Sequence, residues 1–414
     1  MTVPTVNAFI NFSSGPSFAQ TMILDQGLLD TNVLGDATAV IVDVSNQVNG
    51  ITTRRGRNAE ADQFQTGTCT MRIVDENGDF NSMNPLSPYY GLLEPMRKLQ
   101  ITATFNSVTY PVFSGFITGY QTITPQESND NVAYTTITAV DAFRLAQNAQ
   151  ITTVAGTSAG QLSGARIDDL LDAISWPASM RDIDAGQTTM QADPGTQRTA
   201  LAACQTVATS EYGAFYVDAT GSFVFQDRAV TSASISATPT VFSDNATPGI
   251  LYFDAAWVLN DVLIYNQANI TRSGGTTQTA INQPSIDKYF LHSYTQTDLL
   301  MQTDAGALDY GQAYVASRAE TSVRCDGIVL DLYTENYNTG IVAALSLDFF
   351  DPITIITSQP GNSTLEKTLQ IFGVGMTISP NKWRVNFITL EPILDAFILD
   401  SSQYGILDTS SMSY

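Results

Sequence analysis

The chain has 414 residues, which is more than one ordinary hydrophobic core holds and predicts two to four domains. Apolar residues make up 43% and charged residues only 14%, so packed cores are expected and a charge-rich disordered chain is excluded. The 40 acidic and 18 basic side chains give a net charge of -22. A surface of that sign repels phosphate, which argues against tight binding of DNA or RNA.

The N-terminal residues 1–150 are predicted to be mainly strand. Residues 39–44 are a β-branched run, and residues 67–74 alternate between polar and apolar side chains. Turn-forming residues separate these runs from further strand candidates at residues 99–105, 112–120 and 134–140. Several short strands at this spacing favour a closed or nearly closed β-barrel.

Residues 151–235 change character and predict a small α/β module. Apolar side chains recur at helical spacing from Ile167 to Ile174, and Pro177 ends that helix. A second, alanine-rich helix is expected over residues 196–210, followed by a hairpin over residues 214–225.

Residues 236–395 return to strand and predict a second β domain with one helical insertion, at about residues 304–320. Residues 396–414 are expected to form a C-terminal tail with little to bury. No run of about 18 apolar residues predicts a membrane span, and the N-terminus lacks the basic and apolar regions of a signal peptide.

Two internal echoes link the ends of the chain. Residues 113–116 and 371–374 each contain a mid-strand glycine, and each leads through a turn into a strand that ends in an acid, Asp141 or Glu391. A shorter motif, Ile-Leu-Asp followed by Gly-Leu-Leu-Asp-Thr or Gly-Ile-Leu-Asp-Thr, occurs within residues 23–31 and 398–409. Either echo alone could arise by chance, but together they indicate two related β domains.

Catalytic and metal-binding patterns are sparse. His292 is the one histidine, and the three cysteines are far apart in sequence, so neither a nucleophile-histidine pair nor a zinc motif is expected. The acidic run at residues 75–79 has its glycine too early for an EF-hand and predicts a polar hairpin turn. The 40 acids leave a glycosidase-like carboxylate pair open but single none out. We therefore expect no enzymatic activity and no cofactor or metal.

The densest basic feature is Arg54, Arg55 and Arg57. On a strongly acidic chain such a cluster can contact a neighbouring copy, and these three residues are our candidates for an inter-subunit contact. A solvated strand end explains them equally well, so both interpretations stay open.

Several segments together resemble one protein family. The matching residues are 51–57, 64–69, 75–80, 84–91, 95–97, 110–117, 225–228, 313–320, 328–332 and 383–387. They are similar to minor tail proteins of the baseplate-hub type from siphophage-like tailed phages. The matches cover most of the chain, although none is diagnostic alone.

The resemblance implies a mainly β fold with an α/β part: two tube-like β-barrel domains, at residues 1–150 and 236–395, plus the small α/β module. It implies a homotrimeric hub that joins the tail tube to host-recognition components and encloses the DNA channel. The expected partners are distal tail and tube proteins above, tail fibre or tip proteins below, and a tape measure protein. The genome is expected to pass without specific binding, along an acidic channel wall. The expected location is the virion tail tip, assembled in the bacterial cytoplasm.

Three other functions stay open. A distal tail ring protein is also structural, but would assemble as six copies rather than three. A carboxylate-dependent glycosidase of the tail tip would hydrolyse bacterial polysaccharide. A carbohydrate-binding module would present exposed aromatic side chains, which the sequence cannot sort from buried ones.

Overall fold

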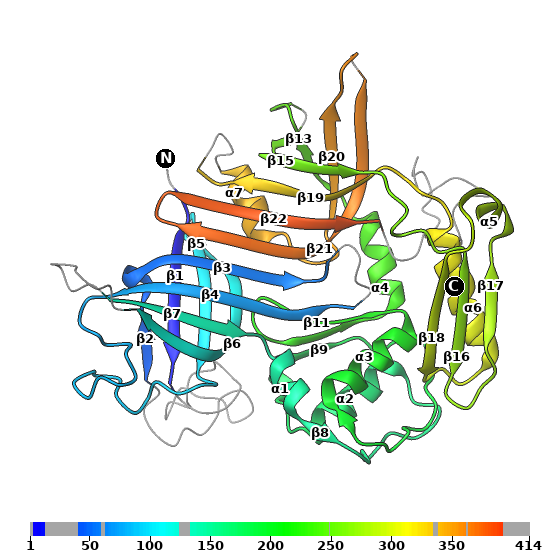
Figure 1. The fold of residues 1–414 in the computed structure, drawn as a ribbon, viewed down its shortest axis with the longest axis horizontal. Coiled ribbons are helices and arrows are strands. Elements are labelled where there is room, and N and C mark those ends of the chain that lie inside the picture. The colour runs from blue at the N-terminus through cyan, green and yellow to red at the C-terminus, as the bar shows by residue number, and fades with distance from the viewer. Residues whose placement is uncertain are drawn as a thin grey trace.

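The computed structural model describes residues 3–12, 40–58, 63–123, 133–247, 249–333, 338–361 and 363–391. The described chain is mainly β, with an α/β part (Figure 1). Fourteen strands from both ends of the chain form one continuous sheet, and their pairing closes no barrel within the described residues. The predicted fold class is thus confirmed at the level of a β fold with an α/β part.

The N-terminal half of this sheet contains seven antiparallel strands. They are β1 (Thr5–Asn11), β2 (Ile41–Asp43), β3 (Val48–Gly56), β4 (Gln65–Asp75), β5 (Lys98–Phe105), β6 (Val108–Ile123) and β7 (Ala133–Val140). Their spatial order is β3-β4-β7-β6-β5-β1-β2. In β4 the alternation is as the sequence predicts, because Cys69, Met71 and Ile73 are buried while Thr70 and Arg72 between them are exposed.

The C-terminal half repeats this arrangement. Its strands are β13 (Thr240–Ser243), β14 (Ile250–Leu251), β15 (Asp254–Val258), β19 (Arg324–Asp331), β20 (Pro352–Ser358), β21 (Thr364–Ser379) and β22 (Lys382–Leu390). They lie in the order β15-β19-β22-β21-β20-β13-β14, so both their chain order and their spatial order match those of the first half. One direction differs, since β13 runs parallel to its neighbours whereas β1 is antiparallel to its own.

The longest strands of the two halves, β6 and β21, match in detail. Each has 16 residues, pairs through its first part with β5 or β20, and pairs through its second part with β7 or β22. Each has a register shift in its middle, before Gly119 in β6 and before Gly373 in β21. The glycine equivalent to Gly373 is therefore Gly119, four residues beyond the glycine in the sequence echo.

The segments that lead into β5 and β20 are alike as well. Met96 and Phe350 both have a φ of 66°, which is rare for residues other than glycine. The Met96 and Phe350 N–H groups donate to the carbonyls of Ile117 and Ile371, at 2.6 and 2.7 Å. Two separate segments with the same backbone outlier and equivalent partner strands, β6 and β21, support the predicted relationship between the two β regions.

The two halves meet in the centre of the sheet, where β21 pairs with β3 (Figure 1). Six residue pairs join these strands in register, from Gly373 opposite Gly56 to Ile378 opposite Ile51. Gly56 has a φ of 100°, and a Cβ there would lie 2.3 Å from the Phe372 carbonyl oxygen. Only glycine fits this junction. One hydrophobic cluster continues through both halves.

The α/β module packs beside this sheet. It contains α1 (Phe143–Asn148), β8 (Gln150–Ile151), α2 (Ser163–Ala173), η2 (Ala178–Met180), β9 (Arg181–Ile183), β10 (Arg198–Thr199), α3 (Ala200–Glu211), β11 (Ala214–Val217), β12 (Phe223–Gln226), α4 (Arg228–Ala233) and η3 (Ser234–Ser236). The predicted helices and hairpin appear as α2, α3 and β11–β12. The Thr199 side chain accepts a hydrogen bond from the Ala202 N–H and caps α3.

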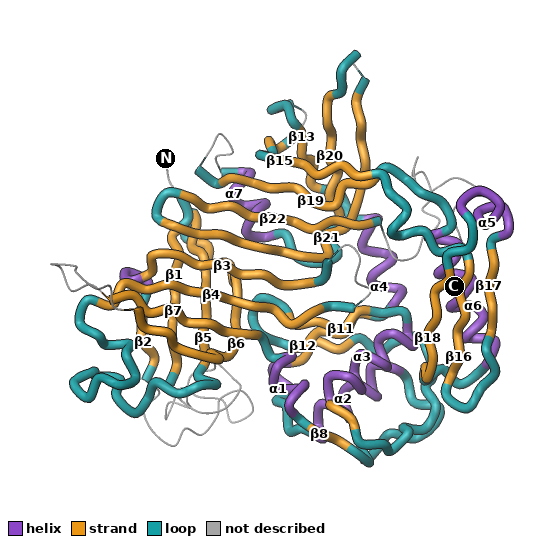
Figure 2. The backbone as a smooth tube through the Cα atoms, in the orientation of Figure 1, coloured by secondary structure: helices purple, strands orange, loops and turns teal. Residues whose placement is uncertain are grey.

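A satellite subdomain lies at the other side of the module (Figure 2). It consists of β16 (Gln267–Arg272), β17 (Gln278–Ile281), α5 (Gln283–Tyr289), β18 (Ser293–Leu299) and α6 (Asp304–Arg318). Its three strands form a separate sheet with its own small hydrophobic cluster. The sequence predicted only α6 here. The remaining helices of the described chain are η1 (Ser45–Gln47) and α7 (Thr339–Ser346).

Candidate functional site

The three candidate arginines face different environments. Strand alternation leaves Arg54 exposed and turns Arg55 into the protein, where its exposed fraction is 6%. Arg57 follows the end of β3 and is also buried, with an exposed fraction of 3%. The sequence placed the three residues in one cluster because it does not show this alternation of faces.

The two buried arginines contact residues of this same chain. The Arg55 guanidinium donates to both carboxylate oxygens of Asp348, at 3.0 and 3.1 Å, and lies 5.0 Å from the centre of the Phe349 ring. Arg57 lies over the Phe372 ring at 4.2 Å. Both therefore help to hold β3 against the segments around β21. Arg54, which bonds Asn58, is the only one of the three whose side chain is exposed.

The open face of the continuous sheet is a polar surface built from strand alternation. Residues directly opposite one another across a ladder lie on the same face. A row of threonines crosses four strands in this way: Thr377, Thr52, Thr70 and Thr138. Threonine suits an exposed strand position because its branched side chain favours strand while its hydroxyl bonds water.

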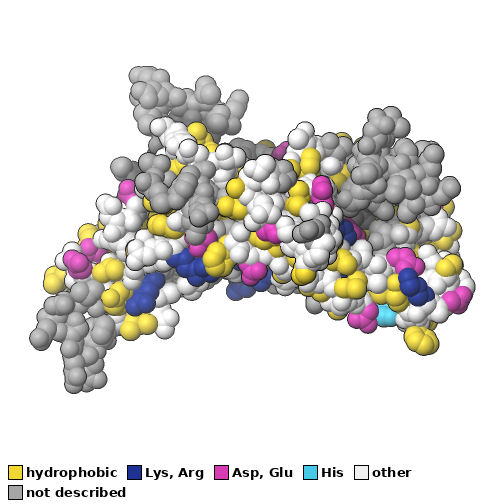
Figure 3. Space-filling view, turned by 90° about the horizontal axis from the view of Figure 1, so that it is seen from above, with side chains coloured by type: hydrophobic (Ala, Val, Ile, Leu, Met, Phe, Trp, Pro, Cys, Tyr) yellow, Lys and Arg dark blue, Asp and Glu magenta, His cyan; other side chains and the backbone are white. Residues whose placement is uncertain are grey.

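The charges on this face differ from those of the whole chain. The register places four basic residues on it, Arg54, Arg72, Lys382 and Arg384, and two acidic residues, Asp254 and Asp331. Arg384 forms an ion pair with Asp331 at 3.1 Å, and Arg72 lies over the Tyr134 ring. Figure 3 shows the molecule as an arch with Lys and Arg side chains gathered on its concave side. The open face is thus polar and weakly basic on a chain of net charge -22.

A row of eight strands within this sheet has an edge at each end that lacks a partner among the described residues. Eight strands lie side by side in the order β15-β19-β22-β21-β3-β4-β7-β6. At one end, β15 pairs only with β19. At the other end, β6 pairs with β7 through Phe116–Ile123, but its pairing with β5 ends at Phe116. Unpaired edges carry backbone donors and acceptors that another strand can bind.

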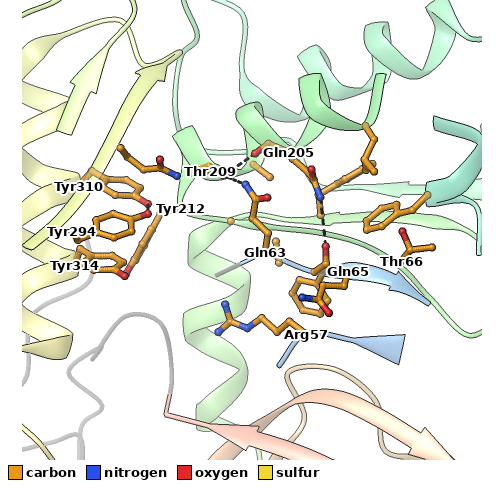
Figure 4. Close-up of a pocket in the computed structure, with 18 of the residues that line it drawn as sticks. Arg57, Gln63, Gln65, Thr66, Gln205, Thr209, Tyr212, Tyr294, Tyr310 and Tyr314 are labelled. Carbon is orange, nitrogen blue, oxygen red and sulfur yellow. Dashed lines mark hydrogen bonds between the residues drawn. The ribbon is translucent and has the colours of Figure 1, made fainter. Parts of the chain in front are cut away.

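A cavity of about 630 Å³ lies where the sheet, α3 and the satellite subdomain meet (Figure 4). Gln63 and Thr209 are hydrogen-bonded across it at 3.1 Å, and Arg57 lines its sheet side. Its other side carries a tyrosine cluster, in which the rings of Tyr294 and Tyr314 stack at 3.9 Å. Tyr314 is 1% exposed, and burial raises the pKa of the Tyr310 hydroxyl. These rings therefore pack on one another and form no open platform for a sugar.

The residues with potential catalytic chemistry lie apart. The His292 ring nitrogen lies 3.1 Å from the Tyr289 carbonyl oxygen, where it packs locally. Burial raises the pKa of the Cys204 thiol to about 12 and that of Cys325 to about 11, which disfavours the reactive thiolates. The described ranges hold no group of three or more His, Cys, Asp or Glu side chains suited to a metal ion, and no helix in them is long and apolar enough to cross a membrane.

The acidic run at residues 75–79 forms a turn. The Asp75 carboxylate accepts hydrogen bonds from the backbone N–H groups of Asp79 and Phe80, at 2.7 and 3.0 Å. Its oxygens are thus used to hold the chain after β4. The predicted C-terminal tail, 396–414, and the motif shared by residues 23–31 and 398–409 lie outside the described residues.

Comparison with known proteins identifies the fold. No protein-family model and no curated protein matches the sequence. Among solved structures, the 43 kDa tail protein of prophage MuSo2 from Shewanella oneidensis aligns with a TM-score of 0.55 and 10% identity, over 85% of this chain and 96% of that one. The tail protein from Neisseria meningitidis MC58 aligns with a TM-score of 0.53 and 10% identity, over 83% and 96%. The chain therefore has the fold of phage tail proteins, as the resemblance in its sequence predicted.

Proposed function

We propose that the chain is a structural hub protein of a phage tail tip, which forms a trimeric ring between the tail tube and the host-recognition components. The observation that carries this proposal is the fold, which is shared with tail proteins over nearly their whole length. Under this proposal the two repeated halves are the tube-like domains. Each contributes half of one subunit's share of the channel wall.

The count of strands supports three copies. Each chain supplies eight adjacent strands, so three chains supply 24. With strands about 4.8 Å apart and tilted by about 40°, a closed wall of 24 strands is about 48 Å across. Inward side chains about 5 Å long leave a bore of nearly 40 Å, which admits a hydrated DNA duplex. Two copies would leave only about 20 Å by the same geometry.

The open face is the surface that would line this bore, because the opposite face is buried in the hydrophobic cluster. Its threonine rows offer DNA no apolar surface and few charges. The bore in this proposal is therefore polar with a few basic side chains, and the expected acidic wall finds no support in the residues of this face. The ion pair of Arg384 with Asp331 neutralises one of the few basic charges, which keeps phosphate attraction weak.

The remaining parts of the proposal concern partners and location. Distal tail and tube proteins would bind one end of the ring and fibre or tip proteins the other, with a tape measure protein as a further candidate. The particle would be assembled in the host cytoplasm, and the chain would act in the virion tail tip without catalysis or a cofactor. Of the three candidate arginines, Arg54 is the one whose exposure fits a contact with another subunit.

Copy number tests the proposal. Tail tips purified from phage particles that carry a labelled version of this chain should contain three copies of it per tail. Six copies would favour the distal tail ring protein instead. Hydrolysis of peptidoglycan or capsule polysaccharide by the purified chain, abolished by changing one or two carboxylates, would show that it is an enzyme.

A further inference from the structure

We infer that neighbouring copies of this chain join edge to edge, with the end of β6 in one copy paired antiparallel to β15 of the next. The contact would repeat, between copies, the junction that β21 and β3 form within one chain. The inference rests on the proposed function, because it needs a ring of copies. It adds the strands, their direction and their register.

The strands β6 and β21 are equivalent. Counting from the shared register shift, Gly119–Ile123 of β6 corresponds to 373–377 of β21, because both segments pair with equivalent residues of β7 and β22. The edge of β21 that faces away from β22 is occupied by β3 over Gly373–Ile378. The same edge of β6 has no partner among the described residues.

The strands β3 and β15 are equivalent as well. Met71 of β4 and Ile328 of β19 lie opposite equivalent residues of β7 and β22, so they correspond. Ile51 of β3 pairs with Met71, and Ala255 of β15 pairs with Ile328. β15 is therefore the C-terminal counterpart of β3, and its edge away from β19 is unpaired in the part of the chain that the structure describes.

The equivalences of β6 with β21 and of β15 with β3 together set the register between copies. Within the chain, Thr377 lies opposite Thr52. The equivalent pairing between copies places Ile123 opposite Ala256. The β15–β19 register shifts between Ala255 and Trp257, where β15 has one residue fewer than β3, so that Trp257 corresponds to Arg54. We expect the new ladder to span residues 120–123 and 256–258.

The ladder should end before Leu259, which stands where β3 has Gly56. In the junction within the chain, Gly56 approaches the Phe372 carbonyl too closely for any side chain. Leu259 cannot adopt that approach and is 63% exposed. The contact between copies is therefore shorter than its template.

Exposed apolar side chains mark both edges. Ile123 is 51% exposed at the end of β6, and Phe253 is 54% exposed immediately before β15. An unpaired strand edge beside such side chains promotes aggregation unless it is covered. Pairing with a second copy covers both edges at once. Because each copy offers one edge of each kind, the contact is head-to-tail and can close a ring.

Disulfide trapping tests the register. The double variant Ile123→Cys, Ala256→Cys places thiols on opposed residues, whose Cα atoms would be about 5 Å apart and within disulfide range. The three native cysteines are buried and free, so they should not interfere. Mild oxidation of assembled rings or tail tips should form a disulfide at each of the three contacts. A non-reducing gel should then show one covalent trimer in which every copy is linked to both of its neighbours.

The matched control is Val108→Cys, Ala256→Cys. Val108 is 49% exposed and lies on the same strand, but at the end that pairs with β5. This control should give no crosslink. A ring of three copies that crosslinks in neither variant, or equally in both, would overturn the edge pairing while leaving the hub proposal intact. Tail tips in which the chain forms no ring would overturn the proposed function, and the inference with it.

A second pair of variants avoids oxidation. Ile123→Lys adds a charge to the edge of β6 and should reduce assembled ring to single folded chains, whereas Val108→Lys should leave assembly unchanged. Native mass measurement reads the copy number, and circular dichroism confirms that both variants are folded. Unchanged assembly of a folded Ile123→Lys variant would contradict the inference.

Discussion

The N-terminal and C-terminal halves of the sheet share their strands and differ in what connects them. The segment between β4 and β5 consists of turns, whereas the corresponding segment between β19 and β20 contains α7. The C-terminal half also holds the whole satellite subdomain between β15 and β19. Strands that pair in one sheet must keep their register, while connections at the ends of the strands can change length. The part that the two halves share is therefore the sheet.

Equivalent residues of the two halves also differ in environment. Asp141 follows β7 and Glu391 follows β22. The Asp141 carboxylate is 3% exposed and accepts hydrogen bonds from the N–H groups of Gly67 and Phe143. Glu391 is partly exposed and forms an ion pair with Lys367. The N-terminal half has thus buried a charge that the C-terminal half leaves in water.

The largest effect is expected at the junction of the halves. Gly56→Val places a side chain against the Phe372 carbonyl and the Gly373 Cα, and forces a β-branched residue to a positive φ. We expect a loss of about 3–5 kcal/mol in the free energy of unfolding, measured with denaturant. Gly91→Ala is the control, because Gly91 has a φ of 80° but open space around it. A cost of no more than about 1 kcal/mol for both variants would show that the close approach is not needed.

The buried Asp141 carboxyl should make the free energy of unfolding depend on pH. Burial raises the pKa of Asp141 from 3.8 to about 7. Below about pH 4 the carboxyl is protonated in both states. Between about pH 4 and 7 the unfolded chain loses the proton first, so the free energy of unfolding should fall as pH rises, by at most about 4 kcal/mol.

Asp141→Asn removes this titration and should flatten the profile over that range, although the variant is less stable overall because its amide cannot accept both N–H groups. Glu391→Gln is the matched control in the C-terminal half and should leave the slope unchanged. Denaturant unfolding at several pH values measures the slopes. Equal slopes in the native chain and in Asp141→Asn would contradict this assignment.

The ion pair across the junction should have a smaller effect. Arg55→Met removes two hydrogen bonds to Asp348 but leaves a carboxylate that water can reach, since Asp348 is 39% exposed. We expect a loss of about 1–2 kcal/mol, and a double-mutant cycle with Asp348→Ala should give coupling of similar size. The cycle would return no coupling if the two side chains acted independently.

Because Arg55 and Arg57 are buried, changing Arg54, Arg55 and Arg57 together to glutamate would test folding rather than assembly.

The smallest effect on stability is expected for Arg54→Glu. This exposed residue lies on the open face, so the free energy of unfolding should change by less than about 0.5 kcal/mol. If Arg54 contacts a neighbouring subunit, ring assembly should weaken, and more strongly at low salt. Thr52→Glu, on the same strand and face, is the control for added negative charge. Unimpaired assembly of Arg54→Glu would show that Arg54 is a solvated surface residue.

The sequence predicted much of this fold because its strongest signals are local. Alternation in β4, helical spacing in α2 and the echo that ends in Asp141 and Glu391 all follow from side-chain periodicity. It did not predict the joining of the two halves into one sheet, because the β21–β3 pairing brings together residues more than 300 positions apart. The short strands β16 to β18 were also missed, since they lack a long apolar run.

The candidate site was less predictable for the same reason. Arg55 and Arg57 are close to Arg54 in sequence, but their partners Asp348 and Phe372 come from the other half of the chain. The charge of the open face depends on which side each strand residue points to, so the net charge of -22 did not indicate it. The unpaired edges have no sequence signature at all, because they depend on which strands are neighbours.

A three-dimensional map of the assembled tail tip, at a resolution that separates strands, tests the central claim most directly. We expect one closed wall of 24 strands, in which three copies each supply eight and β6 of each copy lies beside β15 of the next. A ring of six copies, or a ring of three in which these two edges face away from each other, would contradict this account.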